Sequence, residues 1–397
     1  MIYVELTFWF GTALVTYAYL GYPLLLWLWN RVASEARATA PYTGTVSLVL
    51  AVHNEEGRLA ARLRELIDLL QSSGLTGEVI VVSDGSTDGS AALARSFAGD
   101  GVQVIEVLEN VGKAAAISQA CAQAVGEVIV FADVRQRWDA QALNHLLSNF
   151  ADARVGAVSG DLVLEQSPGV LAGVGLYWRY EKWLRKQESR ARAMVGVTGA
   201  ISAVRRALFR PIPPGTLLDD VYWPLQVAMQ GFRVIHDERA VAYDRLPDKA
   251  ADEFRRKVRT LSGNFQLMQR LPTALVPWRN PIWLQYVSHK LLRLAVPWAL
   301  LGMLAASAML PGWFYRGTLL VQLAGYGWAT LGLAGVPVPL AGAAGSFLVL
   351  NAAAVLGFWV WLTGRSARSW KKIRYEPAPG QVSSGIEGLE HQLVSKV

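Results

Sequence analysis

Four short apolar runs between residues 46 and 132 each end in polar side chains, and helix-like segments separate them. The runs lie within residues 46–52, 78–84, 102–108 and 128–132, and the segments 55–73, 113–125 and 139–150 are predicted to be helices. Unbroken apolar runs of strand length are typical of parallel strands that are buried on both faces. The alternation therefore predicts an α/β fold with a mostly parallel sheet covered by helices on both sides.

The polar residues after these runs stand where such sheets bind ligands. In an open α/β sheet the ligand lies outside the carboxyl ends of the strands, and these ends carry Asn54 and Glu55, Asp84, and Asp133. The sequence Gly-Ser-Thr-Asp-Gly after Asp84 permits a tight turn into a helix. One such turn is also a common structural element, but several at neighbouring strand ends favour a nucleotide-binding site.

The N-terminal segment predicts a membrane helix. The chain has 397 residues, is 52% hydrophobic and has a mean hydropathy of +0.26, which is too apolar for a purely soluble protein. Residues 6–30 carry no charge and can span a bilayer, so a transmembrane helix is predicted over residues 1–30. A cleaved signal peptide fits less well, because the run is too long and no basic residue precedes it. Arg31 and Arg37 follow the run, so the positive-inside rule predicts a cytoplasmic domain after it.

The C-terminal part returns to membrane-like composition after a soluble-type domain predicted over residues 41–281. Residues 282–363 predict an aromatic interfacial helix at 282–293 and three candidate spans, at 294–310, 318–333 and 341–362. Three spans would leave the C-terminus outside, whereas the basic start of the tail, residues 364–397, argues for the inside. We therefore expect one segment, 318–333, to be re-entrant or interfacial. The rest of the tail has the composition of a disordered segment.

Composition narrows the environment and the class of ligand. The single cysteine, Cys121, excludes an internal disulfide and fits a reducing compartment. The net charge of +7 has no basic stripe in a nucleic-acid recognition fold, so we expect no nucleic acid and attribute the charge to an anionic lipid surface or a phosphate-bearing substrate. Residues 177–186 form an amphipathic, basic helix that can lie among lipid headgroups or on the core of the domain.

Six motifs follow one another in an order that resembles family 2 glycosyltransferases. They are His53 to Glu56, Ser83 to Asp88, Asn110 to Lys113, Phe131 to Asp133, Thr198 to Ala200 with Arg205 and Arg206, and Leu218 to Asp220. The chain resembles the cellulose-synthase-like, membrane-bound branch, which includes hyaluronan and poly-N-acetylglucosamine synthases. The resemblance covers residues 45–270. It implies a GT-A-like domain that binds a nucleotide diphospho-sugar, usually a UDP-sugar, and transfers the sugar with inversion.

The resemblance implies a set of donor-binding residues. Asn54, Glu55 and Asp84 would hold the nucleoside, although Ser83 replaces the first of two acids found in many members. Lys113 would approach the diphosphate, where a cation at a helix start is best explained by an anionic ligand. Two further donor-binding residues, Asp133 and Arg135, occupy the family's Asp-x-Asp motif. Asp133 would bind Mg2+ or Mn2+, and Arg135, in place of the second acid, leaves open whether its guanidinium supplies part of the charge.

The resemblance also implies catalytic and acceptor residues. Asp220 would be the base, and its neighbour Asp219 would raise one carboxyl pKa if both acids face the same site. A helix cap is the structural alternative for this pair. Thr198, Gly199 and Ala200 would line the acceptor site. In the family's Gln-x-x-Arg-Trp position the chain has Arg256, Arg259 and Thr260. Arg259 would contact the donor diphosphate and Arg256 would also bind the donor, unless this basic cluster faces lipid. The missing Trp leaves processivity open.

The sequence thus predicts a multi-pass enzyme of the inner or plasma membrane that transfers a hexose or N-acetylhexosamine to a glycan, with partner proteins of a polysaccharide export system. Two alternatives stay open. One is a transferase that adds a single sugar to a lipid-linked acceptor. The other is an inactive protein that binds a nucleotide sugar or glycan and acts as a scaffold in a secretion complex.

Overall fold

The computed structural model describes residues 1–33, 37–165, 172–245, 250–336 and 338–365. Among these residues, one sheet contains eight strands in the order β3-β2-β1-β4-β7-β6-β8-β5. The strands are β1 (Val46–Val52), β2 (Gly77–Asp84), β3 (Val102–Val107), β4 (Val128–Ala132), β5 (Arg137–Trp138), β6 (Val155–Glu165), β7 (Ile201–Arg205) and β8 (Arg233–Arg245). The first four strands pair in parallel, which confirms the predicted fold class. β7 runs antiparallel to both of its neighbours.

Helices cover both faces of this sheet because successive side chains of its central strands point to opposite sides. On β1, Leu48 and Leu50 join a core with α3 (Glu56–Ser73), α4 (Ser90–Arg95) and α6 (Ala142–Ser148). Val49 instead joins the core formed with α5 (Lys113–Gln123) and α8 (Asp219–Met229). Burial on both faces explains why β1 and β2 have unbroken apolar sequences. It also places the starts of α5 and α8 on the same side of the sheet.

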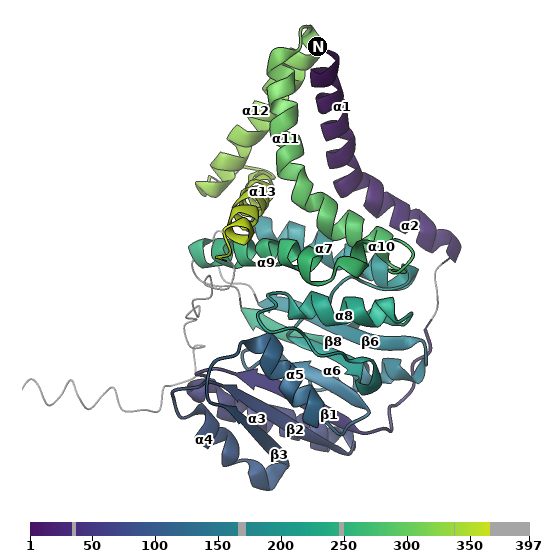
Figure 1. Ribbon diagram of the computed structural model, residues 1–397, viewed down its shortest axis with the longest axis vertical. Coiled ribbons are helices and arrows are strands. Elements are labelled where there is room, and N and C mark those ends of the chain that lie inside the picture. The colour runs from purple at the N-terminus through teal and green to yellow at the C-terminus, as the bar shows by residue number, and fades with distance from the viewer. Residues whose placement is uncertain (34–36, 166–171, 246–249, 337, 366–397) are drawn as a thin grey trace, which may run out of the picture.

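Two long helices, α7 (Ala172–Ala191) and α9 (Ala250–Arg270), lie between the sheet and a group of apolar helices (Figure 1). The basic face of α7 is turned to the domain, since Lys182 pairs with Asp161 on β6 and Lys186 pairs with Glu238 on β8. On its other face, Leu184 is fully buried in a cluster with residues of the N-terminal helix. The amphipathic segment therefore joins the domain to the apolar helices, with part of its basic face neutralised by the sheet.

The apolar helices form a group above the domain. At the N-terminus, α1 (Ile2–Thr16) continues through a π-helical turn into α2 (Tyr22–Ala33). At the C-terminal side, α10 (Trp283–Gln285) continues through a second π-helical turn into α11 (Leu292–Met309). The segment expected to be an interfacial helix, 282–293, is thus continuous with α11, and Tyr286 and His289 in it are buried; its interfacial position stays a prediction. The remaining helices are α12 (Trp313–Leu333) and α13 (Ala341–Leu362).

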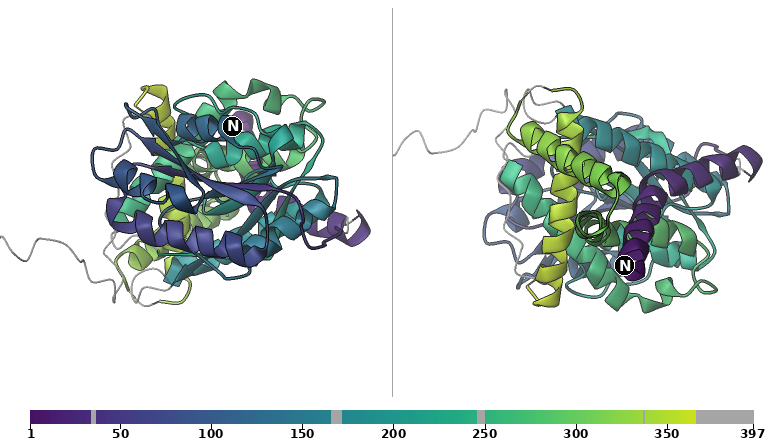
Figure 2. Two further views of the ribbon diagram at one scale, coloured as in Figure 1. Left: turned by 90° about the horizontal axis from the view of Figure 1, so that it is seen from below. Right: turned by 90° about the horizontal axis from the view of Figure 1, so that it is seen from above.

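Three of these helices are long and apolar enough to cross a membrane, among the residues that the structure describes: 2–33, 283–309 and 341–362. Their arrangement differs. In Figure 1 the helices α1 and α11 run side by side away from the domain, and α12 slopes back toward it. The view from above in Figure 2 shows α13 along its length, lying across the top of the domain. Most of the tail predicted from residue 364 lies outside the described residues.

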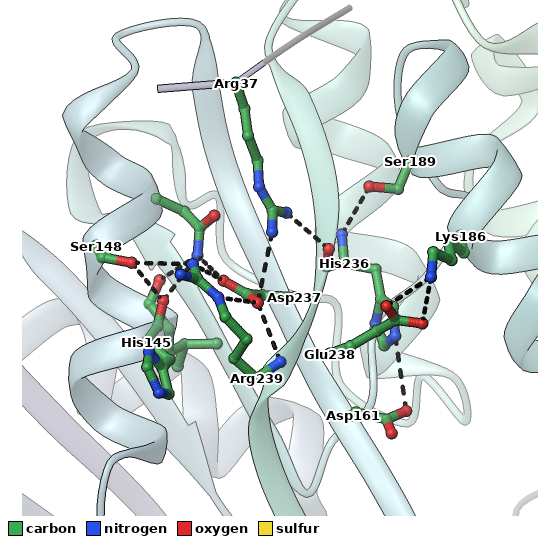
Figure 3. Close-up of polar contacts among 12 residues, drawn as sticks. Arg37, His145, Ser148, Asp161, Lys186, Ser189, His236, Asp237, Glu238 and Arg239 are labelled. Carbon is green, nitrogen blue, oxygen red and sulfur yellow. Dashed lines mark hydrogen bonds and ion pairs between the residues drawn. The ribbon is translucent and has the colours of Figure 1, made fainter. Parts of the chain in front are cut away.

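Polar contacts fasten the membrane-side segments to the domain. Figure 3 shows Arg37, just after the N-terminal helix, donating to the carbonyl of His236 at 2.8 Å and pairing with buried Asp237 at 3.4 Å. Nearer the helices, the hydroxyl of Tyr22 donates to Glu188 of α7 at 2.7 Å. The ring of His289 also lies 2.8 Å from Glu188. One buried carboxylate on α7 thus joins the N-terminal helix to the helix that precedes α11.

Candidate active site

Three elements bring a lysine and two acids together at the carboxyl end of the parallel strands. Lys113 is the first residue of α5, Asp133 follows β4, and Asp219 is the first residue of α8. The ammonium of Lys113 donates to Asp133 Oδ1 at 2.7 Å and lies 4.0 Å from Asp219 Oδ2. Burial would lower the pKa of Lys113, but the charges of Asp133, Asp219 and Asp220 outweigh it and raise that pKa. The ammonium is therefore held charged between two carboxylates.

Asp220 lines the same small cavity as Lys113 and Asp219, together with Gly199 and Trp223. Burial, and then the charge of Asp219, raise the pKa of Asp220 to about 6, while Lys113 opposes the shift. A carboxyl with a pKa just below neutrality is mostly ionised at pH 7 and still a stronger base than an ordinary carboxylate. The structure thus brings together Lys113, Asp133 and both acids at the start of α8, and these residues can bind an anion and accept a proton.

Asp84 shapes the loop that carries Lys113. The buried carboxylate of Asp84 accepts hydrogen bonds from the backbone N–H groups of Val111 at 2.7 Å and Gly112 at 3.0 Å. Gly85 has a positive φ of 63°, and a Cβ there would lie 2.4 Å from the backbone nitrogen of Asn110, so only glycine fits. The strand end predicted to meet the nucleoside therefore also fixes the start of α5. The contact of Asp84 with a base stays a prediction.

The residues after β1 are joined to the turn after β2. Asn54, in the left-handed region at φ 55°, accepts from the backbone N–H of Thr87 at 2.7 Å. The backbone N–H of Glu55 donates to Ser90 at 2.8 Å. These bonds hold Asn54 and Glu55 beside the Asp84 turn, in the region where the sequence predicts the nucleoside.

Arg135 does not occupy a metal-ligand position. Its guanidinium makes two hydrogen bonds to Asp244 of β8, at 3.0 and 2.7 Å, and Asp244 also accepts from Gln136 at 3.0 Å. No group of three His, Cys, Asp or Glu side chains suited to a metal is found within the described ranges. Because a divalent ion takes about six oxygen ligands, Asp133 fits such an ion only if a diphosphate and water supply most of the others.

The loop predicted to line the acceptor site borders the cluster. A Cβ at position 199 would lie 3.5 Å from Nζ of Lys113 and 3.8 Å from Oδ2 of Asp133, so Gly199 leaves the space beside both groups open. Its neighbours Thr198 and Ala200 are buried, and their backbone groups form hydrogen bonds with side chains of the domain. The N–H of Thr198 donates to Ser159 at 3.0 Å, and the carbonyl of Ala200 accepts from Trp138 at 2.9 Å.

Trp223 lines the cavity, and the sequence analysis did not identify it. It is buried and packs against Phe131, with 5.2 Å between the ring centroids. Its position four residues after Asp219 puts it one helical turn below the acids, and this spacing was the available signal.

The basic pair on α9 is not part of this cavity. Arg256 pairs with Glu253 of its own helix at 2.8 Å, and neither Arg256 nor Arg259 lines the cavity among the described residues. The structure therefore does not bring these two arginines to Lys113, and their contact with a diphosphate stays a prediction.

Comparison with known proteins shows which family the chain resembles. The sequence model of the family described as "Glycosyl transferase family 2" matches residues 47–212. Residues 47–212, somewhat less than half of the chain, thus match a family 2 glycosyltransferase domain. The expected resemblance is thereby confirmed, as is the assignment to this enzyme class at the level of the family. The matched residues include Asp84, Lys113 and Asp133, whereas Asp219 and Asp220 lie just beyond them.

Three similar proteins show how far the likeness extends. A poly-beta-1,6-N-acetyl-D-glucosamine synthase of Staphylococcus aureus is 20% identical over 232 residues, or 57% of this chain and 56% of that protein. The chain thus matches little more than half the length of this relative. A dolichyl-phosphate beta-glucosyltransferase of Drosophila melanogaster is 37% identical over 97 residues, 22% of this chain and 30% of that protein.

The third is a solved structure, a mannosyltransferase from Pyrobaculum calidifontis in complex with GDP-Man and Mn2+. It aligns with 91% of this chain and 99% of its own, at a TM-score of 0.68 and 24% identity. The likeness confirms the GT-A-like fold, and because the alignment covers nine-tenths of the chain it includes most of the apolar helices.

Proposed function

We propose that the protein is a membrane-anchored, inverting glycosyltransferase. It moves a hexose or N-acetylhexosamine from a nucleotide diphospho-sugar, UDP-linked in our proposal, to a glycan acceptor during polysaccharide synthesis. The observation that carries the proposal is the single cluster formed by Lys113, Asp133, Asp219 and Asp220 at the carboxyl end of the parallel strands. The family match to residues 47–212 supports the same chemistry.

The cluster supplies the two functions that such a transfer needs. The acceptor hydroxyl forms a bond to the anomeric carbon while the bond to the diphosphate breaks, so a proton must be removed and negative charge develops on the leaving group. Asp220 takes the proton, since its raised pKa suits a base near neutrality. Lys113 stabilises the leaving diphosphate from the start of α5, where the helix N-terminus adds positive partial charge.

We propose that the bound donor completes the metal site. Mg2+ or Mn2+ would be held by Asp133 together with diphosphate oxygens and water, and when bound it would neutralise charge on the leaving group. The Mn2+ in the structure of the Pyrobaculum mannosyltransferase supports such a site.

The location follows from the exposed apolar helices. Side chains such as Phe10, Leu320 and Val321 are 67–74% exposed, which a soluble protein avoids on this scale. We place the N-terminus outside, the domain in the cytoplasm, and α1 and α11 across the inner or plasma membrane. We place α12 as the returning segment, although it is not among the three helices apolar enough to span, and α13 along the inner face because it lies across the domain, although its composition would also allow it to span. This arrangement puts residue 365 inside, as its charge requires, and assigns the interfacial role to α13 instead of residues 318–333. Proteins of a polysaccharide export system would receive the product.

A single addition to a lipid-linked acceptor is the second candidate. Thr260 stands where processive synthases have a tryptophan, and one similar protein is named for a dolichyl-phosphate acceptor. The size of the product separates the two, since a polymer supports the synthase and one added sugar supports the alternative. An inactive scaffold is disfavoured because Lys113, Asp133 and Asp220 form one connected cluster.

The deciding experiment uses Asp220→Asn in the full chain purified in detergent. We expect sugar transfer from a panel of radiolabelled UDP-sugars to fall by about 10²- to 10⁴-fold, the range for loss of a general base, while UDP binding measured by calorimetry is kept. Asp68→Asn, on the exposed side of α3, is the matched control and should transfer normally. Equal turnover by Asp220→Asn and the unmodified chain would remove Asp220 from the mechanism.

A further inference from the structure

The ammonium group of Lys113 lies beside the carboxylate expected to bind the metal ion. Lys113 Nζ lies 2.7 Å from Asp133 Oδ1 and 4.0 Å from Asp219 Oδ2, so one ammonium faces two carboxylates that come from different elements. A divalent ion bound at Asp133 would need carboxylate oxygens as ligands, and the ammonium already lies beside these.

The usual second metal ligand is also missing from this position. The family motif would place a carboxylate two residues after Asp133, but Arg135 stands there and is bound to Asp244. Asp219, with a side chain that is 13% exposed, is the other carboxylate within 4.0 Å of the Lys113 ammonium. Lys113 lies between it and Asp133.

A divalent ion and the ammonium cannot share this position. Both carry positive charge, and an ion bound to Asp133 would lie within a few ångströms of Nζ, where repulsion is strong in a partly buried site. For the ion to take Asp133 Oδ1, the ammonium must leave that oxygen. The flexible four-carbon side chain of lysine permits this movement, and its side chain is 33% exposed.

We propose that Lys113 is a resident counter-ion that keeps a divalent metal from Asp133 until a nucleotide diphosphate binds. The inference rests on the proposed function, because the diphosphate is the anion that offers Lys113 a new partner. When the diphosphate arrives, the ammonium turns to its oxygens and Asp133 becomes available, so metal and nucleotide bind together. Without nucleotide, the ammonium is hydrogen-bonded to Asp133 and lies near Asp219, so its positive charge opposes the metal and metal binding is weak.

The test measures metal binding without any turnover. The full chain in detergent is titrated with Mn2+, and free Mn2+ is followed by electron paramagnetic resonance, first alone and then with saturating UDP or GDP, after subtraction of the Mn2+ that the same nucleotide binds in the absence of protein. We expect the nucleotide to tighten Mn2+ binding at least tenfold. Equally tight Mn2+ binding by the unmodified chain with and without nucleotide would overturn the inference, and this measurement needs no variant.

Variants separate the charge of Lys113 from its size. Lys113→Met should bind Mn2+ at least tenfold more tightly than the unmodified chain in the absence of nucleotide, because the two carboxylates lose their cation. Lys113→Arg, which keeps the charge, should remain weak. Lys182→Met, which breaks the Lys182–Asp161 pair away from the cavity, is the matched control and should behave like the unmodified chain. Unchanged Mn2+ affinity in Lys113→Met would overturn the inference.

Nucleotide binding itself is measured in parallel by calorimetry. If neither UDP nor GDP binds, with or without Mn2+, the proposed donor class fails and the inference fails with it. If a nucleotide binds but Mn2+ affinity does not depend on it, only the role assigned to Lys113 fails.

Discussion

At the scale of the residue, the site depends on the electrostatic interactions among Lys113, Asp219 and Asp220. Asp220 is a half-buried acid beside a second acid and one lysine, and its pKa is raised to about 6 by burial and by Asp219. The negative charges of the nearby aspartates in turn raise the pKa of Lys113 and keep it charged. A carboxylate that is costly to ionise is a liability for folding and an advantage for taking a proton.

The pH dependence of transfer follows from this raised pKa. Because the base must be ionised, kcat/KM should be constant above about pH 7 and fall about tenfold per pH unit below the pKa of about 6. Asp219→Asn removes the second cause of the shift, so its acidic limb should move to lower pH. The measurement is initial transfer rate from pH 5 to 9 at low donor concentration. A limb that does not move would show that Asp219 does not face Asp220 in the working enzyme.

At the scale of the element, glycines let α9 and α13 pack closely in the layer next to the segment that carries the acids. A Cβ on Gly263 of α9 would lie 2.6 Å from Leu218, the residue before Asp219. Gln266 holds the same loop, accepting from the N–H of Leu217 and donating to the carbonyl of Gly215, both at 2.9 Å. On the other side of α9, a Cβ on Gly357 of α13 would lie 2.9 Å from the backbone nitrogen of Ser262. Contacts thus run from α13 through α9 to the acids.

Gly263→Ala tests whether the packing of α9 sets the position of the acids. The added methyl must displace Leu218, and a small shift of the acids should lower kcat by about 10- to 100-fold while changing donor KM little, since catalysis depends steeply on position. Gly325→Ala in α12, where a Cβ meets nothing within 4 Å, is the matched control. Steady-state kinetics at saturating acceptor give both constants. Normal kcat in Gly263→Ala would mean that α9 does not set the position of the acids.

The elements also show what the sequence could predict. The ends of β1 and β4 match the predicted 46–52 and 128–132 because strands buried on both faces leave an unmistakable apolar run. β5, with two residues, and the antiparallel β7 leave no such signal. The cluster was anticipated from motif order, but the turn of Arg135 toward Asp244 depends on a strand more than 100 residues away. No local pattern reports such a contact.

At the scale of the whole molecule, two helices set the orientation of the domain. α1 and α11 pack closely, and a Cβ on Gly11 would lie 2.6 Å from the side chain of Met303. At their far end, Tyr315 donates to Glu5 at 3.0 Å, so the start of α12 lies beside the N-terminus (Figure 1). α13 instead lies near α7 and α9.

Cysteine labelling tests the proposed topology. In a Cys121→Ala background, Trp313→Cys, at an 86% exposed position at the start of α12, should react with a membrane-impermeant maleimide on intact cells. Arg365→Cys should react only after the membrane is opened. Labelling of residue 365 on intact cells would mean that α13 crosses the bilayer. Protection of residue 313 on intact cells would contradict the outward position of the N-terminal end.

The buried contacts of Glu188 with Tyr22 and His289 have a practical meaning for anyone who wishes to work with the catalytic part alone. A shortened chain that starts at residue 41 would lose Tyr22, and Arg37 would no longer cover Asp237. The carboxylate on α7 and the apolar surface around Leu184 would then face water. The N-terminal helix is therefore no detachable tether, and a water-soluble enzyme will not be obtained simply by trimming it away.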